Sequence, residues 1–235
     1  MKIVSWNCRN GLNEIKAKKI YEAFSDADIF VIQECRRTDI DAFKCDWKFK
    51  NWYGDDQEYS DLGIAVFSKE FKIGFSDEFN RKFRYVVPYI VSKGEKFLTL
   101  FAVWTKPVPQ YYDKNVVQAI EYYKTKEFLK GNVIIIGDFN TGYNENTKET
   151  EKYYSDLLEN LKDFKNSSLG KPEEFITTFY HNRGNKEYLN DFCFVSENLF
   201  AGVKFHVHNK WEVNDYGQKR WNGSDHCPIS LEFDF

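Results

Sequence analysis

Two short, strongly apolar runs of the sequence each end on a carboxylate. Residues 29–33 read Ile-Phe-Val-Ile-Gln and lead into Glu34, and residues 133–136 read Val-Ile-Ile-Ile and lead into Gly137-Asp138. Apolar runs of this length are typical of strands that are buried on both faces. Ligand sites of such sheets commonly lie beyond the strand ends, which makes both carboxylates candidates. Acidic residues also end many ordinary strands, and this simpler explanation would suffice for Glu34 alone.

Further segments with strand and helix patterns extend the prediction to an α/β sandwich with mixed sheets and outer helices. The last predicted strand alternates apolar and polar residues, as a half-exposed strand does. The other predicted strands are residues 2–6, 62–67, 84–91, 97–103, 188–195 and 203–208, with 229–235 as the last. Residues 13–25, 114–130 and 151–164 carry apolar residues at helical spacing.

Length and composition favour one domain spanning residues 1–235, with 42 % hydrophobic and 18 % aromatic residues to build a core. The net charge of −3 argues against nucleic-acid binding through the whole surface but leaves room for a basic stripe. No segment resembles a membrane span or a signal peptide, so we expect a cytoplasmic protein. The oligomeric state is not evident, and a monomer is assumed.

A carboxylate inside an aromatic run requires a partner. Asp191 lies within residues 188–195, and burying it unpaired would be costly. Only four histidines are present, and His226 follows Ser224-Asp225 just before the last predicted strand. We therefore expect His226 to pair with Asp191. His206 and His208 alternate on a predicted strand and are expected at the surface or in packing.

Together these polar residues suggest a metal-assisted site. Glu34, Asn7 and Asp225 offer the hard oxygen ligands that suit Mg²⁺ or Mn²⁺. Asp138 could orient or deprotonate a water molecule, and Asn140 could hold that water or a phosphoryl oxygen. The His226 ring could then exchange a proton or donate to a phosphate oxygen. The metal would neutralise charge that develops on phosphorus.

The five cysteines raise the alternative of a zinc site. Four of them, Cys8, Cys35, Cys193 and Cys227, flank proposed site residues. Their spacings match no zinc motif, and the odd total argues against a disulfide framework. We expect buried, reduced thiols with a structural role.

Five motifs in sequence order give the chain a family resemblance. It resembles the endonuclease/exonuclease/phosphatase superfamily from residue 3 to residue 235, with Thr177-Thr178-Phe179 as a lesser motif. The five motifs are Trp6-Asn7, Gln33-Glu34, Gly137-Asp138-Phe139-Asn140, Asn190-Asp191-Phe192 and Ser224-Asp225-His226-Cys227-Pro228.

The resemblance implies a four-layer sandwich of two facing sheets flanked by helices, as in deoxyribonuclease I. It also implies Mg²⁺-dependent hydrolysis of a phosphate ester, most simply by a nuclease or phosphodiesterase. Asn7, Glu34 and Asp225 would belong to the metal site. Asp138 and Asn140 would serve the nucleophile and the phosphate, and Asp191 would pair with His226. A phosphatase or phospholipase-type enzyme acting on a small phosphorylated or lipid substrate is the alternative.

One position departs from the family pattern. Trp104 follows the run Phe101-Ala102-Val103 where the family usually places a His or Tyr that donates to the phosphate. An indole N–H can donate but cannot shuttle a proton. Trp104 therefore either donates to the substrate or only packs, and Lys106, Tyr111 or Tyr112 could compensate. Trp104 is also the one feature in favour of a catalytically silent interaction module.

Two segments mix basic and aromatic residues near the proposed site. Residues 179–186 contain Arg183, and residues 210–223 contain Trp221. Such a mixture suits single-stranded or distorted nucleic acid, with aromatic rings for stacking and cations for phosphate. Ordinary solvated loops are the alternative reading.

Overall fold

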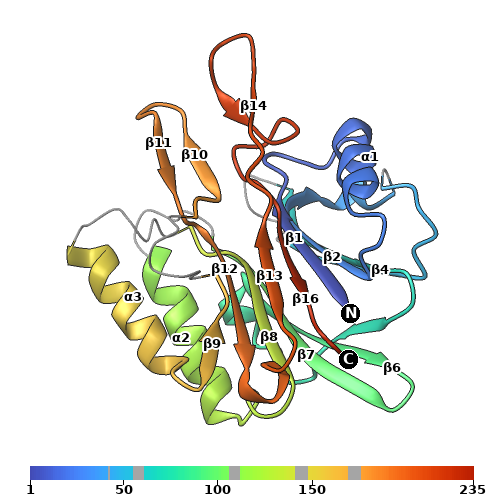
Figure 1. Ribbon diagram of the computed structural model, residues 1–235. Helices are drawn as coiled ribbons and strands as arrows, with labels where there is room; N and C mark the ends of the chain where they lie inside the picture. The colour runs from blue at the N-terminus through green and yellow to red at the C-terminus, as the bar shows by residue number, and fades with distance from the viewer. Residues whose placement is uncertain (42, 55–60, 106–111, 141–147, 169–175) are drawn as a thin grey trace.

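The structure is a computed structural model that describes residues 1–41, 43–54, 61–105, 112–140, 148–168 and 176–235. The expected fold class is confirmed, because two six-stranded mixed sheets face each other with helices outside them (Figure 1). Among the described residues, no helix is long and apolar enough to cross a membrane.

The first sheet joins the two ends of the chain. In it β1 runs parallel to β2 and antiparallel to β16, and β2 runs antiparallel to β4. Its spatial order is β13 (Lys204–Val207), β16 (Ile229–Glu232), β1 (Lys2–Asn7), β2 (Ile29–Arg36), β4 (Leu62–Ser68) and β3 (Phe49–Gly54).

The second sheet, like the first, has a parallel pair of strands at its centre. In it β7 and β8 run parallel, and β12 lies antiparallel to β8. Its spatial order is β5 (Lys72–Phe75), β6 (Val86–Lys93), β7 (Lys96–Trp104), β8 (Val133–Asp138), β12 (Asp191–Ser196) and β9 (Phe164–Asn166).

Within the described ranges, three helices form the outer layers. The helix α1 (Glu14–Ala23) covers the first sheet, while α2 (Tyr112–Thr125) and α3 (Lys148–Asn160) cover the second (Figure 1). Asn13 caps α1 by accepting a hydrogen bond from the Lys16 backbone N–H. The part of the chain that the structure describes also contains three short 3₁₀ helices, η1 (Arg37–Ile40), η2 (Arg81–Phe83) and η3 (Glu197–Leu199).

Apolar side chains fill three cores, one between the sheets and one beneath each helical layer. Strand alternation decides which residues face the space between the sheets. Ile134 and Ile136 lie in that central core, and Asp138 continues the same face of β8. In β1, Ile3 lies in the same central core, and Asn7 lies on the same face of that strand as Ile3. The strand ends therefore bring polar residues of both sheets to one edge of the sandwich.

Two small hairpins project beyond that edge. They are β10 (Phe179–His181) with β11 (Lys186–Tyr188), and β14 (Glu212–Val213) with β15 (Lys219–Arg220). Figure 1 shows both hairpins extending away from the body of the sandwich, at the end opposite the two chain termini.

Several predicted boundaries were wrong. The run at 188–195 is divided, because β11 ends at Tyr188 and β12 begins at Asp191. The last strand ends at Glu232, and its polar face is buried at Ser230, whose Oγ lies 2.9 Å from His208 Nε2. The second helix ends at Thr125 rather than at residue 130. The buried, free thiols of Cys8, Cys35, Cys193 and Cys227 are confirmed.

Candidate active site

Asp138 ends β8 as a fully buried carboxylate. Gly137 precedes it with φ 148°, and a Cβ there would lie 2.0 Å from the Val103 carbonyl oxygen, so β7 and β8 approach closely only with glycine. The carboxylate of Asp138 accepts hydrogen bonds from the Asn140 backbone N–H (2.8 Å), Asn140 Nδ2 (2.9 Å) and Asn7 Nδ2 (2.8 Å). Burial nevertheless raises the pKa of Asp138 to about 7.

His226 lies between two carboxylates. Its Nδ1 donates to Asp191 Oδ2 at 2.9 Å, and its Nε2 lies 3.9 Å from Asp138 Oδ2. Asp191 stands opposite Asp138 in the register of β12 and β8. Burial alone would lower the pKa of His226, but the charges of Asp191 and Asp138 outweigh burial and raise that pKa to about 10. The expected pairing of Asp191 with His226 is present.

Asn7 joins the two sheets at the site. Its Nδ2 donates to Asp138 in the second sheet and to Glu34 Oε1 (3.1 Å) in the first. Glu34 lies at a bulge where the pairing of β2 with β4 shifts between Gln33 and Cys35. Its φ of 56° is left-handed, a conformation that costs a non-glycine residue about 1–3 kcal/mol. The bulge releases Glu34 from the strand alternation and directs its side chain to Asn7.

Asp225 occupies the turn before β16. Its carboxylate pairs with Arg9 Nε at 3.2 Å. The neighbouring Ser224 Oγ donates to the Asn7 backbone carbonyl (2.7 Å) and accepts from the His226 backbone N–H (3.1 Å). The Ser224-Asp225-His226 turn is thus fastened to the end of β1, beside the other polar residues.

The side-chain oxygen atoms at this edge of the sandwich are of the kind that ligates a hard divalent cation. The Asn7 amide spans the carboxylates of Glu34 and Asp138, and each carboxylate keeps free lone pairs beyond its hydrogen bonds. Among the described residues, Asp138, Asp191 and His226 have possible ligand atoms within 4.8 Å of one another. That group consists of residues expected in catalysis, whereas the expected metal ligands Glu34 and Asp225 lie on the side of Asn7 and Arg9.

Trp104 lies in the central core with 2 % of its surface exposed. Its ring packs edge-on against Tyr85 at 5.4 Å between centroids, and its backbone is in register with Asp138. Within the described part of the chain, its buried Nε1–H finds no hydrogen-bond acceptor. Trp104 therefore packs and also keeps an unused donor, so both expectations for this residue are compatible with its position.

The remaining expected substrate-binding residues differ in their surroundings. Arg183 is exposed in the turn of the β10–β11 hairpin. Trp221 is half-buried, and its ring contacts Trp6 edge-on at 5.2 Å. Lys106 lies outside the described residues.

Three residues that support the site were not predicted for these contacts. Thr178 Oγ1 accepts the backbone N–H groups of Asn190 and Asp191, each at 3.0 Å, and so fixes the start of β12. The ring of Phe179 lies 4.7 Å from that of His226. The motif Thr177-Thr178-Phe179 was the sequence signal for these two, and Phe179 also begins the mixed basic and aromatic segment 179–186. Arg9, the partner of Asp225, had no such signal.

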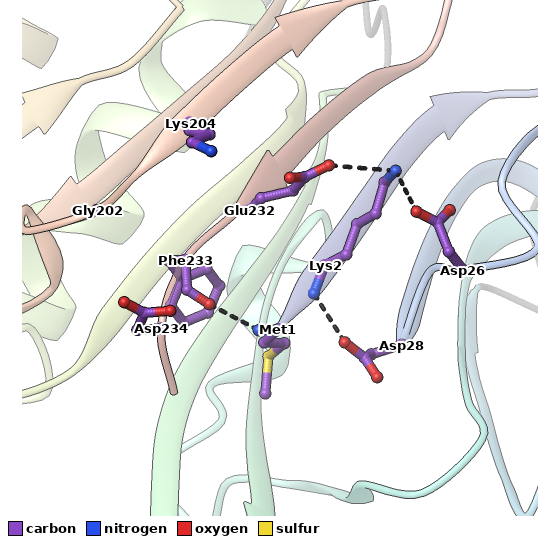
Figure 2. Close-up of a pocket in the computed structure, with 9 residues that line it drawn as sticks. All are labelled: Met1, Lys2, Asp26, Asp28, Gly202, Lys204, Glu232, Phe233 and Asp234. Carbon is purple, nitrogen blue, oxygen red and sulfur yellow. Dashed lines mark hydrogen bonds and ion pairs between the residues drawn. The ribbon is translucent and has the colours of Figure 1, made fainter.

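A polar pocket of about 330 Å³ lies at the opposite end of the sandwich. Figure 2 shows Lys2 between Asp26 and Glu232, with which it forms ion pairs at 2.8 and 3.2 Å. Lys2 and Asn7 stand at opposite ends of β1. None of the expected site residues lines this pocket, and its Lys2 is already paired with two of the pocket's carboxylates.

A family model described as "Endonuclease/Exonuclease/phosphatase family" matches residues 4–226. A search of curated proteins finds no match.

Solved structures resemble the chain over its full length. A 3′-5′ exonuclease, NExo, from Neisseria meningitidis has 19 % identity and a TM-score of 0.70, with 100 % of both chains covered. NExo from Neisseria, described as a 3′ phosphatase bound to a product DNA hairpin, gives the same identity, coverage and TM-score. An AP endonuclease from Archaeoglobus fulgidus has 16 % identity and a TM-score of 0.68, again with 100 % of both chains covered. At these identities the likeness shows the fold alone.

Proposed function

The chain belongs to the endonuclease/exonuclease/phosphatase family, and from that premise we propose that it is a divalent-metal-dependent phosphoric ester hydrolase. One observation carries the proposal. His226 bonds to Asp191 through Nδ1 and turns Nε2 toward Asp138, 3.9 Å away. A buried acid–base pair beside further carboxylates at a strand edge suits in-line attack of water on phosphorus.

The two raised pKa values suit His226 and Asp138 to different catalytic roles. With a pKa of about 10, His226 is an imidazolium at neutral pH and donates to a phosphate oxygen. With a pKa of about 7, Asp138 suits the general base that receives a proton from the attacking water. Asn140 holds the Asp138 carboxylate through both its backbone and its side chain. Asp191 orients the His226 ring.

Mg²⁺ or Mn²⁺ is the proposed cofactor. Glu34 and Asn7 would hold it, and Asp225 would contribute the lone pairs that its ion pair with Arg9 leaves free. When bound, the cation supplies charge neutralisation for the phosphate.

Trp104 is the proposed second donor to the phosphate. A buried N–H without an acceptor costs free energy, and a substrate oxygen would satisfy it. This role replaces the proton-transferring His or Tyr with a neutral donor, so His226 is the residue proposed to donate a proton at the reacting phosphate.

The favoured substrate class is a nucleic acid, cleaved by a nuclease or phosphodiesterase activity. The exposed Arg183 and the two projecting hairpins support this choice, as do the similar structures named exonuclease and AP endonuclease. Lys106 and Trp221 complete the proposed substrate contacts. A phosphatase is the second candidate, because NExo is also described as a 3′ phosphatase. The single domain, the monomeric state and the cytoplasmic location stay predictions.

The test is hydrolysis of bis(p-nitrophenyl) phosphate and of oligonucleotides with and without a 3′ phosphate. The wild type should require Mg²⁺ or Mn²⁺ and lose activity with a chelator. His226→Ala should reduce turnover by roughly 10²- to 10⁴-fold, the usual range for a positioned acid–base group. His206→Ala is the matched control, because His206 is exposed on β13. A wild type without activity on any of these substrates would instead favour the catalytically silent module.

A further inference from the structure

Lys16 is held in an unusual way at the start of α1. Its Nζ donates to three backbone carbonyl oxygens of one loop, those of Cys8 (2.6 Å), Arg9 (2.8 Å) and Gly11 (3.1 Å). An ammonium group has three N–H donors and no acceptor, so this contact uses its full donor capacity. The Lys16 side chain therefore acts as a fixed internal cation for residues 8–11.

The loop that Lys16 binds has a strained backbone. Arg9 and Asn10 have φ values of 54° and 55°, and Gly11 has a φ of 105°. Consecutive left-handed residues other than glycine cost free energy and persist only where the surroundings fix them. The ammonium supplies such a constraint, because without it three carbonyl dipoles would converge on one point without a donor.

The same loop holds the residues proposed to bind metal. The Asn10 backbone N–H donates to Glu34 Oε2 (2.8 Å), and the Gly11 N–H donates to the Glu34 carbonyl (2.8 Å). The Arg9 N–H donates to Asn7 Oδ1 (2.9 Å). A change in the path of residues 8–11 would therefore move Glu34 and Asn7.

Lys16 also touches the second loop of the site. A Cβ at Gly223 would lie 3.5 Å from Lys16 Cε, and Asn222 Nδ2 donates to the Lys16 carbonyl (3.2 Å). The residues that follow Gly223 are Ser224, Asp225 and His226. Lys16 thus lies where the loop after β1 meets the turn before β16.

We propose that Lys16 is a positioning residue for the metal site, setting the geometry of Glu34 and Asn7 through the loop of residues 8–11. This inference rests on the proposed function. Lys16 touches neither substrate nor reacting atoms in this role. The alternative is that its long stem only packs, in which case its loss would change stability and leave metal affinity unchanged.

The experiment measures direct Mn²⁺ binding by electron paramagnetic resonance of the free ion, with the full-length protein and no substrate. Lys16→Ala should raise the Mn²⁺ dissociation constant by about 10- to 100-fold, the usual effect of losing an outer-sphere support. Lys16→Met keeps the apolar stem and removes the donors, so it should weaken binding similarly. Lys19→Ala, an exposed lysine of the same helix, should bind Mn²⁺ as the wild type does.

Chemical rescue separates the cation from the packing. Propylammonium replaces the atoms that Lys16→Ala removes, and it should restore Mn²⁺ affinity, whereas tetramethylammonium has no N–H and should not. Folding of each variant is checked by circular dichroism. Unchanged Mn²⁺ affinity in either folded Lys16 variant overturns the inference while leaving the proposed function intact. A wild type that binds no Mn²⁺ overturns both.

Discussion

Asp138 and His226 lie in a buried cluster, and the protonation of these two residues is coupled to folding. Both Asp138 and His226 have folded-state pKa values above their ordinary ones, so the folded protein binds protons more tightly than the unfolded chain. Stability from such groups is present at low pH and declines as pH rises. For Asp138 the decline falls between its ordinary 3.8 and about 7, and for His226 between 6.5 and about 10.

The prediction concerns the pH range in which the folded-state His226 loses its proton. Between pH 7 and pH 10, in the presence of a chelator, the free energy of unfolding of the wild type should fall by a few kcal/mol, since each tenfold change in proton affinity corresponds to about 1.4 kcal/mol. His226→Gln should flatten this decline, because it removes the titrating ring. Urea unfolding at several pH values measures the effect. An equally steep decline in the variant would mean that other groups cause it, and His206→Gln should keep the wild-type slope.

The sequence predicted the contacts of some site residues and not those of others. Asp191 was predictable because a carboxylate in an aromatic run needs a partner, and His226 was the best placed of four histidines. Lys16 and Arg9 were not predictable, because their partners depend on the path of a loop. The Lys16 ammonium binds backbone carbonyls, which have no sequence signature, and Arg9 meets Asp225 more than 200 positions away in the chain.

At the scale of elements, the two projecting hairpins behave as one unit attached to the site. Arg220 of β15 donates to Asn182 in the β10–β11 turn at 2.8 Å, and Lys219 forms an ion pair with Glu187 of β11. The Tyr180 backbone N–H bonds to the Asp225 carbonyl (2.8 Å), which fastens β10 to the turn that bears His226. These contacts therefore connect both hairpins to the candidate active site.

The β14–β15 hairpin presents an aromatic ring. Asn214 Oδ1 accepts the backbone N–H groups of Tyr216 (3.1 Å) and Gln218 (2.9 Å), which makes the turn stiff. Tyr216 is 86 % exposed at its tip. A ring held in water on a stiff turn is suited to stacking on a nucleic-acid base, while Arg183 on the other hairpin is suited to a phosphate.

We therefore expect Tyr216→Ala and Arg183→Ala each to raise KM for a single-stranded oligonucleotide by about 10-fold, the effect of losing roughly 1–3 kcal/mol of stacking or charge. Activity on bis(p-nitrophenyl) phosphate should not change, because that substrate is too small to reach the hairpins. Steady-state kinetics on both substrates measure the difference. Phe97→Ala removes a similarly exposed ring at the far end of β7 and serves as the control. Equal losses on both substrates would contradict a role in strand binding.

The hairpins were also the elements least visible in the sequence. Long apolar runs predicted the central strands of both sheets, because those strands are buried on two faces. The strands β10, β11, β14 and β15 have three residues or fewer, so no period of two can be recognised. The last strand was predicted as half-exposed, since its alternation does not reveal that Ser230 is buried against the His208 side chain.

At the scale of the whole molecule, local sequence patterns did not predict the order of the strands in each sheet. The pairing of β1 with β16 joins the two ends of the chain, and only the family resemblance predicted that the two sheets face each other. The candidate site depends on this arrangement, because Asn7 and Glu34 belong to one sheet and Asp138 to the other. Side chains of the two sheets meet through Asn7 Nδ2 and the Asp138 carboxylate at 2.8 Å.

A cation at this junction should consequently stabilise the whole sandwich. A ligand that binds only the folded state adds about 2.7 kcal/mol at 100 times its dissociation constant. For a chain of 235 residues, this corresponds to an increase in Tm of roughly 5–10 °C. Differential scanning calorimetry with Mg²⁺ or Mn²⁺, followed by a chelator, should show this increase and its reversal.

Two variants test where the stabilising cation binds. Glu34→Gln should lose most of the increase, because it removes a charged ligand at the junction of the sheets. Glu232→Gln should keep it, because Glu232 lines the polar pocket at the other end of the sandwich, where Lys2 already pairs with it. If Glu232→Gln loses the increase and Glu34→Gln keeps it, the cation binds at the wrong end for catalysis. A metal requirement for hydrolysis would then have to arise from the substrate phosphate rather than from the ligands of the two sheets.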